Sequence, residues 1–518
     1  MSRRNPNLAE SFAELRADYS AAKQSRFRRR RTGLNPLGSG ADYHYRSEGD
    51  YLRIMEYARD MDRNDCIVGQ TVDRAVSNEI QDGFCQTPQT GDRQIDRDLS
   101  ARWDAWAADA DQCDLAGEKT FWDQEQFVSR HCKVDGDILG LATQPGSTEL
   151  VEGHRLRTPT YRAKNTTHGV EMDPVSRKPT RYWLTADDVG TAAMTLKLDA
   201  FRPYDARDAA GYRQVFHVRT GKRVSQTRGI SAFVPIFDVC GMFEDINFAT
   251  LLQRQIVACF AIFAERDKDY QQQLAAALGA GETLETQPDG TSKVIEGMGP
   301  GRIFDGKPGV KYHLDSPNVP NPEYFPHMKM VLTLIGINLG LPVCLVLMDP
   351  SDTNFSGWRG AVDQARLGFK TNQRRLIERW HRPIYLWQVR RWMAADPILA
   401  AAAERSGIDI FAHRWNPPTW PYIQPLQDAT ADLVRTRNAL ISQRRRCAER
   451  GMEWTDLSSE IVEDNAELIE KAFVKATELN QKYPDLNVTW REIASLPTAD
   501  GINISLSNQQ PEPSNAAA

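Results

Sequence analysis

The stretch Met330–Met348 reads MVLTLIGINLGLPVCLVLM, and it decides how the rest of the chain is interpreted. It is almost wholly apolar, and its length meets the usual minimum of ~18 residues for a membrane span. However, Asn338 stands at its centre and Pro342 would break a spanning helix. Gly336 and Gly340 weaken such a helix further. We therefore predict a buried helix that runs into a loop, and we keep a membrane span as the minority interpretation.

Two long helices are predicted around this stretch, with a different kind of segment between them. Residues 323–341 form the second helix, and residues 236–264 form the first, a long apolar run ending in Ile256–Phe263. The first helix is long enough to project from a globular body as a rigid extension. Residues 266–322 are rich in Gly, Pro, Gln and Asp, which predicts a small β and loop excursion.

A polar loop and a further long helix are predicted directly after the apolar stretch. Residues 349–357 read DPSDTNFSG, a composition typical of a loop. In the following helix, to residue 394, Val362, Phe369 and Leu376 lie on one face, and Pro383 predicts a kink.

The N-terminal half is predicted to change from helical to β-rich. Residues 51–80 have helical periodicity with an interruption at Asn64–Asp65. Helices are also predicted around Trp103 and Trp106, whose rings we expect in the core, and over residues 121–128. From about 136 to 234, short β-like runs alternate with turn signals, and the strand candidates are residues 169–172, 181–185 and 212–218.

The C-terminal part is predicted to be helical after an extended connector. Residues 411–425 are rich in Pro and Trp, which favours extended backbone. Two amphipathic helices follow, one over 429–440 and one over 462–476. The composition of the last residues predicts a disordered tail.

Composition and charge limit the classes of function. The chain has 518 residues, of which 41% are apolar and 26% charged, with a net charge of −5, so it is typical of a globular protein and not of a simple high-affinity DNA binder. Residues 1–31 carry nine Lys and Arg against three Asp and Glu, whereas residues 452–518 carry four against twelve. Five of the N-terminal cations form a basic arm that is either merely solvated or contacts phosphate or an acidic partner: Arg26, Arg28, Arg29, Arg30 and Arg31.

Motifs that would indicate catalysis are not found in the sequence. There is no GxxxxGK[ST] phosphate loop, no GxSxG and no HExxH, and His131-Cys132 has no second pair to complete a zinc site. The eight cysteines contain no CxxC pair, which favours a reducing environment. We therefore predict no catalytic residue, no metal and no cofactor. A catalytic site assembled from distant positions is kept as an alternative.

Several short strings, in this order along the chain, resemble the lambda-family portal proteins of tailed phages. Each is weak alone, but their joint order is specific, and the likeness runs from about residue 10 to 480. Three departures are a missing Pro-Gly within 221–229, Gly357 in place of a second Ser, and an unusually apolar 343–348. The strings are residues 57–65 with 72–78, 103–106, 135–137, 169–173 with 178–184, 228–231, 339–342 with 354–359, 415–418 and 425–428.

The resemblance implies an α+β portal fold and a ring, usually of about twelve subunits, around a DNA channel at one capsid vertex. It implies a β-rich wing, long stem helices, a small α/β clip, a long kinked helix behind a tunnel loop, and a helical C-terminal crown. The implied segments are a basic arm (1–50), the wing (51–235), stem helices (236–265 and 323–342), the clip (266–322), the tunnel loop (343–356), a long helix with remaining wing (357–426), the crown (427–484) and a tail (485–518).

The resemblance also implies partners and a DNA-facing site. The terminase large subunit and later the head–tail connector or adaptor proteins would dock on the clip, and the major capsid protein would surround the ring. The protein would reside in the virion, and in the host cytoplasm during assembly. The residues expected to face double-stranded DNA, weakly and without sequence specificity, are Asp349, Ser351, Asp352, Thr353, Asn354, Phe355 and Ser356.

Two rival interpretations stay open at this point. A soluble enzyme would be favoured by a monomer with a deep polar pocket. A membrane pore using residues 330–348 would be favoured by detergent-dependent solubility. The ring interpretation, in contrast, predicts an oligomer without detergent and no membrane association.

Overall fold

The structure is a computed structural model. The basic arm, Asp352, most of residues 266–322 and the end of the predicted tail lie outside the residues that it describes. Those residues are 47–159, 165–186, 189–190, 196, 200–265, 282–286, 292–296, 302–306, 324–351, 353–420, 425–450, 452, 454–483 and 487–494. The chain divides into two compact units, residues 1–83 with 88–415 and residues 84–87 with 416–518.

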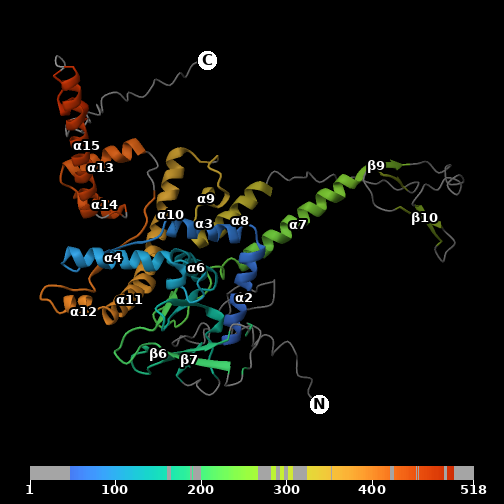
Figure 1. The fold of residues 1–518 in the computed structure, drawn as a ribbon. Helices are drawn as coiled ribbons and strands as arrows, with labels where there is room; N and C mark the ends of the chain where they lie inside the picture. Colours follow the sequence, from blue (N-terminus) through green and yellow to red (C-terminus); the bar gives the residue numbers. More distant parts are fainter. Residues whose placement is uncertain are drawn as a thin grey trace. The chain divides into compact units, whose positions relative to one another are not determined.

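The first unit opens with two helices, α2 (Glu48–Asn64) and α3 (Val68–Ile80) (Figure 1). Asp65 separates them, because its Oδ1 accepts hydrogen bonds from the N–H groups of Ile67 at 2.8 Å and Val68 at 2.9 Å. An Asp that satisfies the free N–H groups of the next helix is a common helix start. The predicted interruption at Asn64–Asp65 is therefore confirmed.

A layer of aromatic rings lies among the following helices, α4 (Arg93–Ala108), α5 (Ala110–Cys113) and α6 (Phe121–Val134). The ring of Trp103 lies 5.0 Å from that of Trp106, 5.1 Å from Phe121 and 5.6 Å from Tyr385. All four side chains are buried. The predicted core role of the two tryptophans is confirmed.

Two antiparallel sheets form the β-rich part of this unit. One has the order β3 (Thr148–Glu152), β2 (Asp137–Ala142), β8 (Val215–Arg219). The other has the order β4 (Thr166–Thr167), β5 (Val170–Met172), β6 (Pro179–Thr185), β7 (Phe201–Asp205). A short 3-10 helix, η3 (Gly153–Arg155), follows β3.

One apolar cluster is shared by both sheets, and it includes Leu139 and Val215 from the first and Val170 and Leu184 from the second. The predicted strands at 169–172, 181–185 and 212–218 correspond to β5, β6 and β8. Strands β2, β3, β4 and β7 of these two sheets were not predicted.

The first long helix is shorter than predicted. α7 (Phe237–Cys259) ends before residue 264, and β9 (Phe260–Glu265) follows it directly (Figure 1). The run Phe260–Phe263 contains two aromatic residues and a β-branched residue, which suit a strand as well as a helix. β9 pairs in parallel with β12 (Arg302–Gly306), and this pairing decides between the two. The hairpin β10 (Glu282–Thr286)–β11 (Ser292–Glu296) lies between them in sequence.

The remaining helices of the first unit follow α8 (Tyr324–Leu339), which packs against α7. They are α9 (Val343–Leu347), α10 (Phe355–Leu376), the π-helical segment η7 (Ile377–His381), α11 (Arg382–Ala395) and α12 (Pro397–Ala403). The predicted long helix near Pro383 is thus confirmed. Pro383 has no N–H to continue an α-helical ladder, and the wider π turn precedes it. α12 was not predicted.

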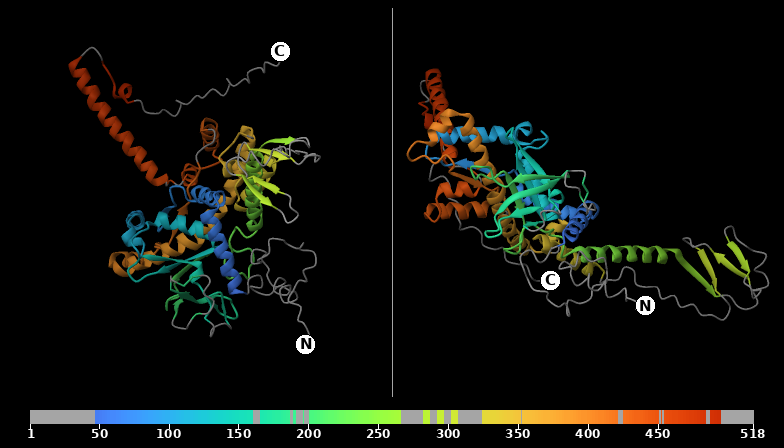
Figure 2. Two further views of the ribbon diagram at one scale, coloured as in Figure 1. Left: turned by 90° about the vertical axis from the view of Figure 1, so that its right-hand side faces the viewer. Right: turned by 90° about the horizontal axis from the view of Figure 1, so that it is seen from below.

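The second unit is mainly helical, with α13 (Pro425–Arg437), α14 (Gln443–Glu449), α15 (Trp454–Lys482) and α16 (Trp490–Ile493). Figure 2 shows α15 as one long helix, in red. The two predicted helices correspond to α13 and α15, whereas α14 and α16 were not predicted. Strands β1 (Cys85–Pro88) and β13 (His413–Asn416) carry the chain across the boundaries between the units.

The apolar stretch 330–348 is not one continuous helix, since α8 ends at Leu339 and α9 begins at Val343. Within the described residues, no helix has both the length and the apolar character that a membrane crossing requires. The prediction that the stretch is buried was only half right. Leu332 and Ile335 are buried, but Leu334 and Ile337 are exposed.

Candidate functional site

The segment between α8 and α10 carries the residues that the sequence singled out. Its first half is helical, because α9 occupies Val343–Leu347 within the predicted tunnel loop. The non-helical part runs from Met348 to Asn354. The long helix then begins at Phe355, two residues earlier than predicted.

The buried side of this segment is fixed to neighbouring helices. Cys344 and Val346 are buried, and α9 packs against α3 and α8. Arg74 of α3 donates a hydrogen bond to the carbonyl oxygen of Val346. Near the end of α8, the amide of Asn338 donates to the carbonyl oxygen of Ala232. These contacts fix the position of the chain where the loop after α9 begins.

The loop itself is exposed and satisfies its polar groups locally. Oδ1 of Asp349 accepts from the N–H of Ser351 at 2.9 Å, and Oγ1 of Thr353 donates to the carbonyl oxygen of Pro350 at 3.1 Å. Oδ1 of Asn354 accepts from the N–H of Gly357 at 2.7 Å, which caps α10. Hydrogen bonds from the side chain and backbone of Ser351 lower the pKa of Asp349.

The surface formed by this loop combines polar side chains with the exposed apolar side chains of Met348 and Phe355. Phe355 and Ser356 are exposed at the first turn of α10, next to the loop, and none of the described residues from 347 to 357 is a cation. The structure brings Asp349, Ser351, Thr353, Asn354, Phe355 and Ser356 together on one short segment, while Asp352 lies outside the described residues. No group of potential metal ligands is found among the residues that the structure describes. A surface without cations, such as this loop, can lie close to a polyanion without binding it tightly.

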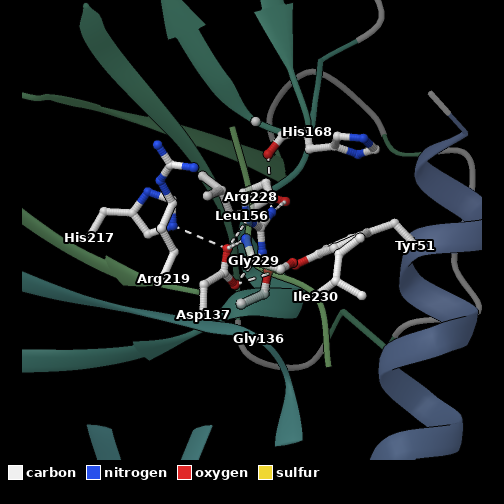
Figure 3. A network of polar contacts seen from close by, with 12 residues as sticks. Tyr51, Gly136, Asp137, Leu156, His168, His217, Arg219, Arg228, Gly229 and Ile230 are labelled. Carbon is white, nitrogen blue, oxygen red and sulfur yellow. Dashed lines mark hydrogen bonds and ion pairs between the residues drawn. The ribbon is translucent and has the colours of Figure 1, made fainter. Parts of the chain in front are cut away.

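Asp137 of β2 and Arg228, which precedes α7 along the chain, form a fully buried ion pair (Figure 3). Nη2 of Arg228 donates to Oδ1 of Asp137 at 2.8 Å and to the carbonyl oxygen of Gly153 at 2.8 Å. Its Nη1 donates to the carbonyl oxygens of Leu156 and His168, each at 3.1 Å. One guanidinium therefore connects β2, η3 and the segments on either side of β4.

Further contacts complete this network. The hydroxyl of Tyr51 in α2 donates to the carbonyl oxygen of Gly229 at 2.8 Å, and His217 Nε2 lies 3.1 Å from Asp137 Oδ2 (Figure 3). Burial alone would raise the pKa of Asp137, but Arg228 and His217 outweigh it and hold this pKa well below its usual range. Burial also lowers the pKa of His217, and Asp137 opposes that shift.

Gly136 allows the chain to approach this network closely. Its φ is +97°, and a Cβ built there would lie 2.3 Å from the backbone nitrogen of Ile230. Only glycine accommodates both the left-handed backbone and the contact. The network thus fixes the turn Arg228–Ser231, from which the chain continues into α7.

The sequence profile of the family described as phage portal protein, lambda family, matches residues 27–373. That is more than half of the chain. The chain belongs to the lambda family of phage portal proteins. It is accordingly a structural protein of the virion, in a family whose members are not catalysts.

Solved structures similar to this portal protein come from gene transfer agent (GTA) particles. One is titled as the neck of an empty GTA particle computed with C6 symmetry, with 12% identity, a TM-score of 0.38, and coverage of 78% of this chain and 94% of that chain. The other is titled as the virion of a native GTA particle, with 11% identity, a TM-score of 0.35, and coverage of 78% and 93%. A search of curated proteins gives no match.

The portal sequence contained signals for the buried network, although its geometry was not predicted. Asp137 belongs to the string 135–137 and Arg228 to the string 228–231, and both strings were noted only for their order along the chain. Their contact joins residues 91 positions apart. Arg74 and Asn338, which fix the base of the loop, gave no comparable signal. The basic arm stays a prediction, because it lies outside the described residues.

Proposed function

We propose that this portal protein forms a ring of about twelve copies at one capsid vertex, and that the central channel conducts double-stranded DNA during packaging and ejection. The observation that carries the ring is a set of exposed apolar side chains on α7 and α8. Phe325 is 63% exposed and Ile337 66%, both on α8, and Phe248 of α7 is 69% exposed. Single subunits rarely leave such helix faces uncovered.

Neighbouring copies would cover these faces. In a closed ring each subunit presents two different faces, so that one copy's face packs on the other face of the next copy. α15 also exposes Val462 and Phe473, at 66% and 60%, on the second unit. The exposed apolar helix faces of both units support a homo-oligomer.

The loop 348–354 is our candidate for the surface that faces DNA. Passage of DNA requires weak contact, because each phosphate neutralised by a cation strengthens binding. The loop offers hydroxyl, amide and carboxylate oxygens, and Asp349 would repel phosphate. Asp352 would add a second negative charge.

The other segments take the roles that family membership suggests. Residues 266–322 would form the clip and bind the terminase large subunit during packaging and the head–tail adaptor proteins afterwards. Residues 51–235 would form the wing next to the major capsid protein, and residues 427–484 the crown. Assembly would take place in the host cytoplasm.

Added positive charge on the loop tests the proposed channel surface. We expect Asp349→Lys with Ser356→Lys to slow packaging, because new cations would bind the passing phosphates. The variants would be supplied to a phage that lacks its own portal gene, and the packaged DNA per particle would be measured. Asp104→Lys, exposed on α4, is the control. Equal packaging by the loop variant and the control would exclude the loop from the channel wall.

A further inference from the structure

A cavity of about 870 Å³ in the first unit has an unusual lining. Residues from β5, β6 and β8, from the turn before β6, from the segments 206–213 and 222–227, and from η7 surround it. Eight Lys and Arg side chains line it, and no Asp or Glu does. These elements are distinct from the loop 348–354.

Among the eight cations that line the cavity, the seven other than Arg177 form no ion pair within the described part of the chain. Arg207 donates to the carbonyl oxygen of Gly211 at 2.6 Å, and Arg219 donates to that of Gln226. Both partners are neutral carbonyls, which do not compensate the positive charge of these two guanidinium groups. Within the described part of the chain, no ion pair is formed by Lys178, Arg213, Lys222, Arg223 or Arg379.

The acidic residues nearby are engaged elsewhere. Asp205 pairs with Arg181 at 3.0 Å, and Glu378 pairs with Arg374 at 3.0 Å. Asp208 accepts from the N–H of Tyr212 at 2.8 Å, and Asp173 accepts from the N–H of Ser176 at 2.7 Å. None of these four carboxylates lines the cavity, although the charge of Glu378 partly offsets the charge of Arg379.

The cations also act on one another. Burial lowers the pKa of Arg379, and the charges of Arg219, Arg375 and Arg213 lower it further, whereas the charge of Glu378 opposes this shift. Arginine stays protonated at all ordinary pH values, so this repulsion persists in the empty cavity. A bound anion would relieve it.

A dense row of negative charges fits this lining best. In an extended acidic peptide, successive carboxylates point to opposite faces, so those on one face lie ~6.6 Å apart, whereas a single nucleic-acid strand carries one phosphate charge per ~3.4 Å. Guanidinium groups match phosphate oxygens in planar, two-point contacts. We propose that this cavity binds a run of closely spaced phosphate groups, carried by a nucleic-acid strand or by inorganic polyphosphate.

A smaller hollow of about 330 Å³ extends the same surface. It shares Arg207 and Arg213 with the cavity and adds Arg382 and Arg390. One carboxylate also lines it, that of Glu378, which pairs with Arg374. The guanidinium of Arg390 lies over the ring of Tyr212 and covers one face of that ring. Arginine side chains therefore predominate in this hollow too, and little aromatic surface is free for base stacking. This lining favours contact with the phosphate backbone and not with bases.

Binding of a labelled strand tests this site. The full-length protein is titrated with a fluorescein-labelled oligothymidine of about twelve nucleotides, and anisotropy is measured at several salt concentrations. We expect Arg213→Ala with Arg379→Ala to weaken binding at least about tenfold and to reduce the salt slope by about 1.4, since each lost phosphate contact on a single strand contributes about 0.7. Lys178→Ala with Lys222→Ala, at two exposed positions, gives a second variant pair with the same expectation.

The matched control removes the same charge from α15, with Lys471→Ala and Lys475→Ala, at positions that are 72% and 61% exposed. Unlabelled tripolyphosphate should displace the strand. Wild-type affinity in both cavity variants, or no binding by the wild type, would overturn the site. Displacement by polyglutamate as effective as by tripolyphosphate, at equal charge, would assign the cavity to an acidic peptide instead. The measurement reports on the subunit itself, so its outcome is independent of ring formation.

Discussion

Asp137 shows how one residue stabilises the junction before α7. Its carboxylate is fully buried and accepts hydrogen bonds from Arg228 and from the N–H of Gly229 at 3.2 Å. A buried ion pair contributes little net stability compared with an apolar pair, but the loss of one partner leaves a buried charge without compensation.

We therefore predict that Asp137→Asn destabilises the first unit by about 3–5 kcal/mol. The measurement is the shift in the urea midpoint, followed by near-ultraviolet circular dichroism. Asp205→Asn is the control, because Asp205 is 67% exposed in its pair with Arg181 and should contribute less than about 1 kcal/mol. Similar shifts for the two variants would show that the buried network does not hold the junction.

Glu152 gives a prediction about pH. A hydrogen bond from His154, together with the charge of Arg59, lowers the pKa of Glu152 from 4.5 to about 2, against the effect of burial. Because the folded-state pKa is depressed, this stabilisation is present above the unfolded value and is lost as pH falls from 4.5 to about 2.

Accordingly, Glu152→Gln should be less stable than the wild type at pH 7 and should lose less stability between pH 4.5 and 2. Thermal unfolding at several pH values measures both. Glu118→Gln, at a side chain that is 75% exposed, should follow the wild-type curve. If Glu152→Gln lost as much stability as the wild type between pH 4.5 and 2, the lowered pKa of Glu152 would be contradicted.

At the scale of elements, β2 and η7 meet so closely that a methyl group has no room. A Cβ built at Gly140 would lie 2.5 Å from the ring of Trp380, which is fully buried. The indole is rigid and surrounded by other core side chains, so it cannot move aside without repacking.

We predict that Gly140→Ala costs about 1–3 kcal/mol, as overpacked cores do. Gly368→Ala, in the middle of α10, is the opposite case, because nothing lies within 4 Å of the added Cβ. That variant should gain about 0.5–1 kcal/mol from helix propensity. Urea unfolding of both variants is the measurement. If Gly140→Ala left the free energy of unfolding unchanged, β2 and η7 would pack less closely than the structure shows.

The outcome for each element shows which parts of this fold the sequence could predict. Local signals located α2, α3, α8 and α10, because Asp65, Asn354 and Pro383 act within one or two turns of where they stand. The end of α7 could not be predicted, since β9 is a strand only through pairing with β12, some 40 residues away. The loop at 349–357 was predicted from its composition, but α9 was not, because its apolar residues gave no periodicity over so short a length.

The candidate sites also differ in how far the sequence could predict which residues they bring together. Loop residues such as Asp349 and Asn354 follow one another in sequence, so their grouping could be predicted. The pair Asp137–Arg228 and the cations around the cavity come together only through the sheet topology. Arg213 and Arg379, for example, are far apart in sequence and meet because η7 packs against β8. Charge counts along the chain could not show this.

At the scale of the whole molecule, exposed apolar helix faces indicate subunit contacts. Leu334 and Ile337 lie one helical turn apart on α8 and are 43% and 66% exposed. Charges placed there would be buried without partners in a ring but would stay solvated in a free subunit.

We predict that Leu334→Asp with Ile337→Asp shifts the protein from rings towards free subunits, at unchanged subunit stability. Size-exclusion chromatography with light scattering measures the distribution. Val175→Asp is the control, because Val175 is 91% exposed in the turn before β6 and not on a helix face. Rings that persist in the α8 variant at the wild-type proportion would place this face outside the subunit interface.

The native mass of the purified protein tests the central claim most directly. Mass photometry without detergent, alone and after addition of the phage's own head-assembly proteins, should show a closed ring near twelve times the 58.5 kDa subunit, about 700 kDa. Electron micrographs of that species should show a central hole. A species that stays at 58.5 kDa under both conditions would contradict the ring, and with it the proposed DNA channel.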